Sequence, residues 1–182
     1  MTVKKKKTNN KVLVEKVMRS FLDVYDLEGA NFYDTPRRVA QLWDAFLTRE
    51  KPAMRAFPSE SKELAVVKDY TSWGFCPHHL LPVEYKFKVG YIPNGKVVGL
   101  SKIPRLVDYF LARMPLQEDL PGLIVDELER ILKPLGSGCT VEGQHLCCVA
   151  RGIKSKDIKF TNTALRGVIL LSPTTHNEFL RA

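Results

Sequence analysis

Two short stretches of the sequence concentrate side chains that could do chemistry. The first, "CPHHLLP" at 76–82, contains Cys76, His78 and His79 inside a run of Leu, Val and Tyr. Cys76 and His79 form a C-x-x-H pair, a spacing that lets two ligands reach one metal ion across a turn. On its own this spacing is a weak signal, and an acid–base pair or side chains that only pack are alternatives, so the rest of the chain has to decide.

The second stretch is "QHLCC" at 144–148, with His145, Cys147 and Cys148. It lies in a predicted strand, where His145 and Cys147 project to one face and Cys148 to the other. Three protein ligands with water in the fourth position are typical of a catalytic zinc site, and a Cys–His–Cys set fits this open arrangement. Cysteines on strands are also commonly small buried hydrophobes, and we assign Cys139 and Cys148 to that class.

The composition is that of a soluble globular protein, and the absence of a targeting segment leads us to expect a cytoplasmic location. The 182 residues suffice for one substantial domain, and 45% of them are hydrophobic and 26% charged. No apolar run approaches the roughly 20 residues needed to span a bilayer. The N-terminal "MTVKKKKTNNK" has no apolar segment behind its lysines, so we expect no secretory signal and reduced cysteines.

The net charge of +8 includes the lysine run Lys4–Lys7, and residues 1–9 are predicted to be a solvated, disordered basic tail. The remaining positive charge favours an anionic ligand. The sequence argues against nucleic acid as a partner, because it has no RNP-type aromatic motif, zinc-finger spacing or basic recognition helix.

Residues 10–62 are predicted to form a helical segment and a connector. An apolar residue recurs every fourth position between 10 and 26, which indicates an amphipathic helix with the stripe Leu13, Val17, Phe21 and Tyr25. A second helix is expected to start with Thr35 as N-cap and Pro36 in the first helical position. Its apolar stripe consists of Val39, Leu42, Trp43 and Phe46. Residues 51–62 carry two prolines and no sustained period, which is typical of a connector.

Residues 63–182 are predicted to form an α+β domain of order β-β-α-α-β-β. Alternating apolar residues over 82–92 predict a long half-buried strand, and the turn at 93–96 predicts that "KVVGL" pairs back onto it as a hairpin. A helix capped by Ser101 and reaching about Met114 follows, then a second helix with the apolar face Leu123, Leu128, Ile131 and Leu132. Two further strands are predicted within 138–150 and 159–171.

Such an arrangement forms one antiparallel sheet with a helix pair on one face. The other face carries a mixture of polar and apolar side chains and needs cover. We therefore expect neighbouring subunits to provide it.

Four segments together resemble one enzyme family. They are "CPHHLLP", "VGYIPNGKVVGLSKIPRLVDYF", "PLQEDL" and "EGQHLCCVARGIK". These segments resemble GTP cyclohydrolase I. The resemblance runs in unbroken order from "TPRRVA" near residue 35 to the closing "EFLRA". The joint match is highly specific, since neither chance nor a shared fold would produce all four segments in this order.

The resemblance implies a tunnelling fold for 63–182, in which subunit sheets join into a β-barrel ring and two rings stack as a homodecamer. It implies that GTP binds at subunit interfaces beside a zinc ion. The implied reaction releases guanine C8 as formate and yields 7,8-dihydroneopterin triphosphate, from which folate, biopterin and deazaguanine biosynthesis begin.

The resemblance also assigns roles to residues. By motif position, Cys76, His79 and Cys147 correspond to the family's zinc ligands, and His78 and His145 to its two proton-transferring histidines. Glu118 matches the carboxylate that holds the guanine N1–H and 2-amino group, with Gln117 in the same motif. The residues that match the triphosphate contacts are Ser101, Lys102, Arg105 and Arg151. Ser101 and Lys102 also stand at a predicted helix start, where free backbone N–H groups favour phosphate.

Three positions depart from the family's usual pattern. Pro77 stands where most members have a glutamate that could orient a neighbouring histidine, and Asp119 stands where an arginine is usual. The Thr-rich segment before the last strand is reduced to "TNT" at 161–163.

Three alternatives stay open beside the enzyme. The departures allow a catalytically silent zinc-containing ring that binds a purine nucleotide, and the basic tail allows a nucleic-acid-binding module. A related tunnelling-fold pterin enzyme is the nearest rival, but those enzymes use a histidine-dominated zinc site and only four histidines occur here.

Overall fold

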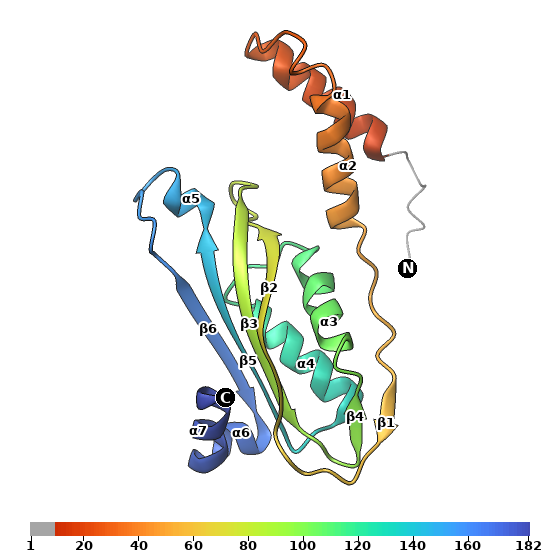
Figure 1. Ribbon diagram of the computed structural model, residues 1–182, viewed down its shortest axis with the longest axis vertical. Coiled ribbons are helices and arrows are strands. Elements are labelled where there is room, and N and C mark those ends of the chain that lie inside the picture. Colours follow the sequence, from red (N-terminus) through yellow and green to blue (C-terminus); the bar gives the residue numbers. More distant parts are fainter. Residues whose placement is uncertain (1–9) are drawn as a thin grey trace, which may run out of the picture. The chain divides into compact units, whose positions relative to one another are not determined.

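The computed structural model describes residues 10–182 (Figure 1). The predicted basic tail, residues 1–9, lies outside the described residues. The chain divides into two compact units, one that ends at Arg49 and one that runs from Glu50 to Ala182. No helix among the described residues is long and apolar enough to cross a membrane.

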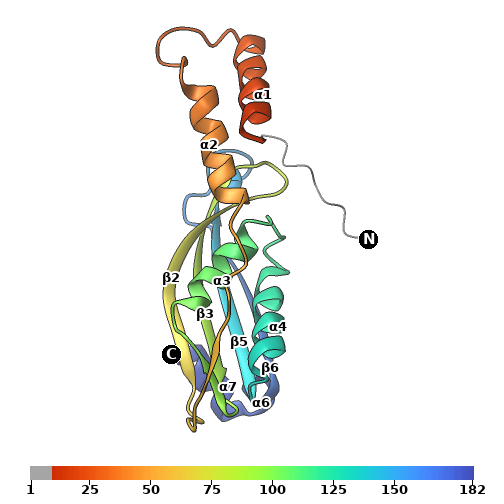
Figure 2. The ribbon, with the colours of Figure 1, turned by 90° about the vertical axis from the view of Figure 1, so that its right-hand side faces the viewer.

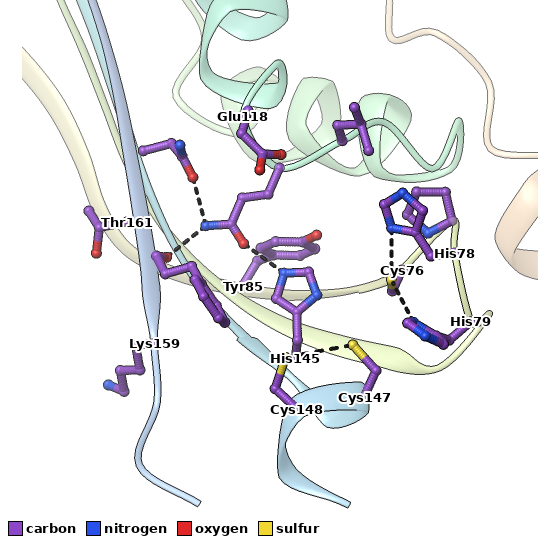
Figure 3. A pocket seen from close by; sticks show the side chains of 15 residues that line it. Cys76, His78, His79, Tyr85, Glu118, His145, Cys147, Cys148, Lys159 and Thr161 are labelled. Carbon is purple, nitrogen blue, oxygen red and sulfur yellow. Dashed lines mark hydrogen bonds between the residues drawn. The ribbon is translucent and has the colours of Figure 1, made fainter. Parts of the chain in front are cut away.

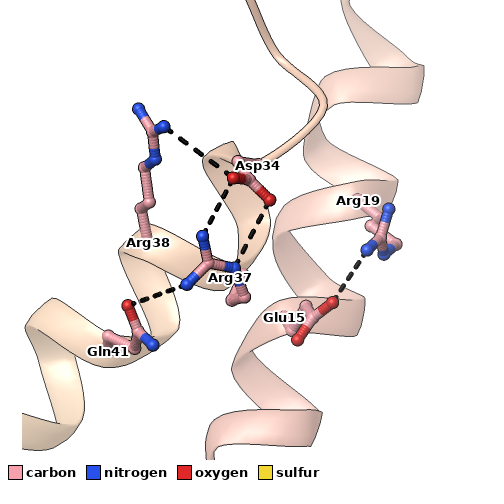
Figure 4. Close-up of polar contacts among 6 residues, drawn as sticks. All are labelled: Glu15, Arg19, Asp34, Arg37, Arg38 and Gln41. Atoms are coloured by element: carbon pink, nitrogen blue, oxygen red, sulfur yellow. Dashed lines mark hydrogen bonds and ion pairs between the residues drawn. The ribbon is translucent and has the colours of Figure 1, made fainter.

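The N-terminal unit consists of α1 (Asn10–Val24) and α2 (Thr35–Leu47). The two helices are joined by an ion pair of 3.0 Å between Lys11 and Asp44. Asp34 precedes α2 without capping it, and instead accepts hydrogen bonds from Arg37 Nε and Nη2 at 3.3 and 2.9 Å (Figure 4). Thr35 is therefore the first helical residue rather than the N-cap that we predicted, and Pro36 lies in the first turn as expected.

The predicted apolar stripe of α1 is exposed within this unit. Leu13, Val17, Phe21 and Tyr25 are 48 to 67% exposed, whereas Leu22 is buried. The sequence period is that of an amphipathic helix, but among the described residues of this unit α1 packs against α2, which leaves these four side chains exposed.

The second unit is built on a four-stranded antiparallel sheet in the order β2-β3-β5-β6. Its strands are β2 (Ala65–Phe75), β3 (Pro82–Ile92), β5 (Gly136–His145) and β6 (Phe160–Arg166). β3 is central and pairs with β2 on one side and with β5 on the other. The alternation that predicted this strand is confirmed, because the side chains of its inward positions are 0 to 2% exposed: Val83, Tyr85, Phe87, Val89 and Tyr91.

The predicted hairpin between β3 and the segment after its turn is wrong. β4 (Lys96–Val98) pairs instead with β1 (Ala56–Pro58) in a separate two-stranded sheet, and its Val98 N–H donates to the Tyr91 hydroxyl at 3.0 Å. Both edges of β3 are already occupied by β2 and β5. The sequence did not reveal β2, because a bulge between Val67 and Tyr70, with Asp69 at a φ of 58°, interrupts its alternation.

Helices α3 (Lys102–Leu111) and α4 (Leu120–Leu132) lie side by side on one face of the sheet, as predicted (Figure 2). Their side chains that are at most 1% exposed include Ile103, Leu106, Val107, Ile124 and Leu128. Two details differ from the prediction. α3 ends at Leu111 rather than near Met114, and Leu123 is 39% exposed because Ile124 and Val125 face the sheet instead.

The end of the chain covers part of the opposite face. The predicted strand over 159–171 stops at Arg166, and Gly167–Leu171 form α6, followed by α7 (Pro173–Arg181). Gly167 makes this turn with a φ of 56°, and a side chain there would overlap the Leu135 carbonyl. Ile169 of α6 and Phe179 of α7 then form a small core with Ile92. This cover lies at the end of the sheet where β3 finishes.

Candidate functional site

A pocket of about 480 Å³ lies at the other end of the sheet, where β3 begins and β5 ends. Val83 and His145 are direct cross-strand partners at this end. The loop after β2, the start of β3, the end of β5 and the start of β6 all contribute to the wall, as does the loop before α4 (Figure 3). Four stretches of chain that are far apart in the sequence, 76–85, 116–118, 145–148 and 159–162, therefore converge on this pocket.

The loop 76–81 is folded tightly enough to hold two of the predicted ligands together. The Cys76 carbonyl accepts the Leu80 N–H at 2.8 Å, and the Cys76 N–H donates to the Leu81 carbonyl at 2.9 Å. Leu80 adopts the left-handed region at a φ of 54° to close the turn. As a result, the Cys76 Sγ lies 3.7 Å from His79 Nδ1 and 3.8 Å from His78 Nδ1.

Cys147 reaches the same place from the other side, although not from a strand. β5 stops at His145, and Leu146–Val149 form the short helix α5. The prediction that His145 and Cys147 project from one strand face is therefore wrong, because the helical turn re-aims the chain after His145. This turn still brings Cys147 to Cys76 and His79.

The ligand atoms of Cys76, His79 and Cys147 lie within 4.8 Å of one another. Sulfur and nitrogen ligands of a tetrahedral zinc ion lie about 3.6 Å apart, given metal–ligand distances of roughly 2.3 and 2.1 Å. The 3.7 Å between Cys76 and His79 matches this spacing. The donor set of two thiols and one imidazole is also the chemistry that zinc prefers, so these residues fit the ion that the sequence predicts.

Burial, with smaller contributions in the same direction from the neighbouring thiols of Cys148 and Cys76, raises the pKa of the Cys147 thiol to about 11. In the absence of a cation, this environment keeps the thiol protonated. A bound cation would reverse the balance by stabilising the thiolate.

His145 lies at the back of the pocket against two aromatic rings. Its ring meets those of Tyr85 and Phe160 edge-on, with centroid distances of 6.1 and 5.6 Å. Burial lowers the pKa of His145, Glu118 raises it in part, and His78 lowers it. The neutral imidazole is therefore favoured in the free protein.

The other predicted site residues divide into two groups. His78, Gln117 and Glu118 line the pocket together with the predicted ligands and His145. The predicted triphosphate residues do not line it: Ser101, Lys102, Arg105 and Arg151. Ser101 stands just before α3 but forms no capping hydrogen bond, contrary to our prediction. The start of α3 follows β4, which is tied to Tyr91 near the far end of β3 (Figure 1).

Several pocket residues were not found from the sequence. Tyr85 was expected only as an inward core residue, and Cys148 only as a buried cysteine, yet both line the pocket. Lys159, Phe160 and Asn162 also line it. The signal available for Asn162 was its place in "TNT", a segment that on sequence alone stands out only as a departure from the family pattern.

A concave pocket with a few convergent polar groups, here including a possible metal-ligand set, is the arrangement expected of a small-molecule site. The profile of the family described as GTP cyclohydrolase I matches residues 13–182. This match includes most of α1, whereas the recognisable motifs began near residue 35. The chain belongs to the GTP cyclohydrolase I family, a family of hydrolases.

Individual relatives are similar in sequence over most of the chain. GTP cyclohydrolase 1 of Wolinella succinogenes is 33% identical over 180 residues, covering 94% of this chain and 96% of the relative. GTP cyclohydrolase 1 of Aquifex aeolicus is 37% identical over 176 residues, with the same two coverages. GTP cyclohydrolase 1 of Chlorobaculum tepidum is 40% identical over 163 residues, covering 86% of this chain and 72% of the relative.

Among solved structures, the apo form of an archaeosine synthase QueF-Like is similar in fold. The TM-score is 0.50 at 20% sequence identity, and the match covers 59% of this chain and 97% of that one. At this identity the similarity concerns the fold alone.

Proposed function

We propose that this protein is a zinc-dependent GTP cyclohydrolase I, which hydrolyses guanine C8 of GTP to formate and yields 7,8-dihydroneopterin triphosphate. The family membership supports the reaction class. The observation that carries the proposal is the convergence of Cys76, His79 and Cys147 beside His145 and Glu118 in one pocket.

Cys76, His79 and Cys147 would hold the zinc ion. Three ligands leave a coordination position open, and a zinc ion in such a site supplies a hydroxide nucleophile because it lowers the pKa of bound water to about 7. The two cysteines come from the end of β2 and from α5, so the ion would also link two parts of the chain that are distant in sequence.

The histidines would move protons at the purine. Guanine C8 becomes a good electrophile only when N7 is protonated, and His145 is the half-buried acid–base group at the back of the pocket. His78 is exposed at the wall of the pocket and would serve the later proton transfers that open the imidazole and ribose rings.

Glu118 would recognise the guanine. An ionised carboxylate only accepts hydrogen bonds, so it complements the two adjacent donors at N1 and the 2-amino group. Its side chain is exposed at the pocket wall, where a ligand can reach it.

The triphosphate would be held by Ser101, Lys102, Arg105 and Arg151. The first three lie on and before α3, away from the pocket of their own chain, which supports a site completed by a second subunit. We propose the β-barrel ring and the homodecamer on the same ground, as the assembly in which one subunit's α3 serves its neighbour's pocket.

The test is formate release from GTP by the zinc-loaded protein, together with the appearance of a pteridine product. Cys147→Ser and His145→Ala should abolish both. Zinc and GTP binding without formate release would instead favour a silent nucleotide-binding ring. Pro77 and Asp119 would then be the first residues to restore to the family's Glu and Arg.

A further inference from the structure

Gln117 is buried beside His145, and every polar atom of its side chain has a partner. The residue is 6% exposed. Its Nε2 donates to the Phe160 carbonyl at 2.6 Å and to the Asn162 Oδ1 at 3.0 Å. Its Oε1 lies 2.8 Å from His145 Nε2 (Figure 3).

The Phe160 carbonyl fixes which way the Gln117 amide points. A backbone carbonyl can only accept, so the amide end that faces it must be the NH₂ group. The amide oxygen therefore faces His145, and it too can only accept. It follows that His145 Nε2 carries a proton in both the neutral and the charged form of the ring.

Gly143 provides the space in which this amide lies. It precedes His145 on the same face of β5, and a Cβ at Gly143 would overlap the Gln117 Oε1 and approach the Tyr85 ring to 2.9 Å. Any other residue at position 143 would push the amide away from His145.

We propose that Gln117 is a positioning residue that holds His145 with Nε2 as a permanent donor, so that His145 exchanges protons with substrate only at Nδ1. Asn162 and Gly143 keep Gln117 in place. This inference rests on the proposed function for the reaction that His145 serves. Nδ1 is turned toward the side of the pocket where Cys76, His79 and Cys147 lie (Figure 3).

The same contacts leave Gln117 unable to donate a hydrogen bond to the substrate. Both of its N–H groups are already donated within the protein, so its amide has no donor left for guanine. Glu118, which is exposed next to it, is the residue of this motif that remains available to the base. The two residues of this motif therefore have different roles: Gln117 orients His145, and Glu118 binds the substrate.

The first experiment separates turnover from binding. Gln117→Met keeps the volume but removes the acceptor, and Gly143→Ala displaces the amide without removing a polar group. Each should lower kcat by about 10- to 100-fold, the cost typical of removing a group that orients a histidine ligand. Gly138→Ala is the matched control, since it adds the same methyl group earlier in β5, against the Leu165 and Phe179 side chains.

GTP affinity is measured in a His145→Ala background, where no turnover interferes. There Gln117→Met should leave Kd within about twofold, because a positioning residue acts through His145. A large rise in Kd would overturn the proposal and assign Gln117 to substrate contact, and an unchanged kcat in Gln117→Met would overturn it by showing that His145 does not depend on the amide. Asn162→Ala, which leaves the Phe160 carbonyl in place, is a third variant and should lower kcat by a smaller factor.

A spectroscopic readout works without any reaction. With ¹⁵N-labelled histidine, a protected N–H resonance should be assignable to His145 Nε2 by its loss in His145→Ala. It should persist in Gly138→Ala and disappear in Gln117→Met and Gly143→Ala. Its absence from the wild type would refute the hydrogen bond, whereas its presence in a protein that releases no formate would refute only the proposed function.

Discussion

The thiols of Cys76 and Cys147 meet in space, although one follows β2 and the other lies on α5. Their Sγ atoms are within 4.8 Å of each other and of a His79 ring nitrogen. The tight turn at 76–81 sets the position of the first thiol, and the end of β5 at His145 sets that of the second. The candidate metal centre thus depends on the sheet register that places Val83 opposite His145.

We predict that Cys147→Ser loses bound zinc while Cys148→Ser retains it. The two cysteines are adjacent and their Sγ atoms are 3.9 Å apart, but only Cys147 belongs to the three-ligand group. Loss of a ligand should cost at least the roughly 10- to 100-fold in affinity that loss of a ligand's hydrogen-bond partner costs. Metal analysis after gel filtration measures this, and equal zinc in both variants would contradict the assignment.

A second prediction concerns two inactive variants expressed together. If Lys102 serves the pocket of a neighbouring chain, Lys102→Ala and His145→Ala subunits should complement each other in mixed assemblies. With random mixing, about a quarter of the sites would combine an intact Lys102 with an intact His145. Formate release near that fraction of wild type is expected.

The control for this experiment places both substitutions in one chain and mixes that chain with wild type. No recovery in the first mixture, with assembly intact, would show that Lys102 acts within its own chain.

A third prediction tests the cover formed by the C-terminal helices. Phe179 is fully buried against Ile92 and Ile169, whereas the adjacent Leu180 is 48% exposed. Phe179→Ala should lower the free energy of unfolding by about 3–5 kcal/mol, and Leu180→Ala by much less. Urea unfolding at matched protein concentration compares the two, and similar losses would mean that α7 does not pack on the sheet as described.

Periodicity and motifs correctly predicted the elements whose structure is determined by their own local sequence. The alternation in β3 and the stripe facing inward from α3 needed no knowledge of the partner strands. β2 was missed because its bulge at Asp69 breaks the alternation, and β4 was misassigned because its pairing depends on which edges of β3 are free. Such outcomes are decided by tertiary contacts rather than by local preference.

The residues of the candidate site also fall into those that local sequence predicts and those that only tertiary contacts reveal. Cys76, His79 and Cys147 were predicted from residue type, spacing and resemblance, and the structure brings them together. Asn162 and Gly143 could not be found, because their connection to His145 runs through the buried Gln117 amide. No single-segment pattern encodes a contact of that kind.

The last prediction concerns Glu127, whose side chain is 9% exposed and paired with Arg130 and Lys51 at 2.7 and 2.8 Å. The Arg130 hydrogen bond lowers the pKa of Glu127 below its usual 4.5, burial opposes this, and Lys51 lowers it further. A carboxylate whose pKa is lower in the folded than in the unfolded protein stabilises the fold above pH 4.5. This contribution is lost as the pH falls through the pKa of Glu127 in the folded protein.

Glu127→Gln should therefore lower the free energy of unfolding by about 1 kcal/mol at pH 7, since both cations are exposed, and by little in strong acid. Urea unfolding at both pH values measures the difference, with Asp126→Asn, at an exposed neighbouring position, as control. A loss that persists unchanged in acid would show that Glu127 acts by packing and not by charge.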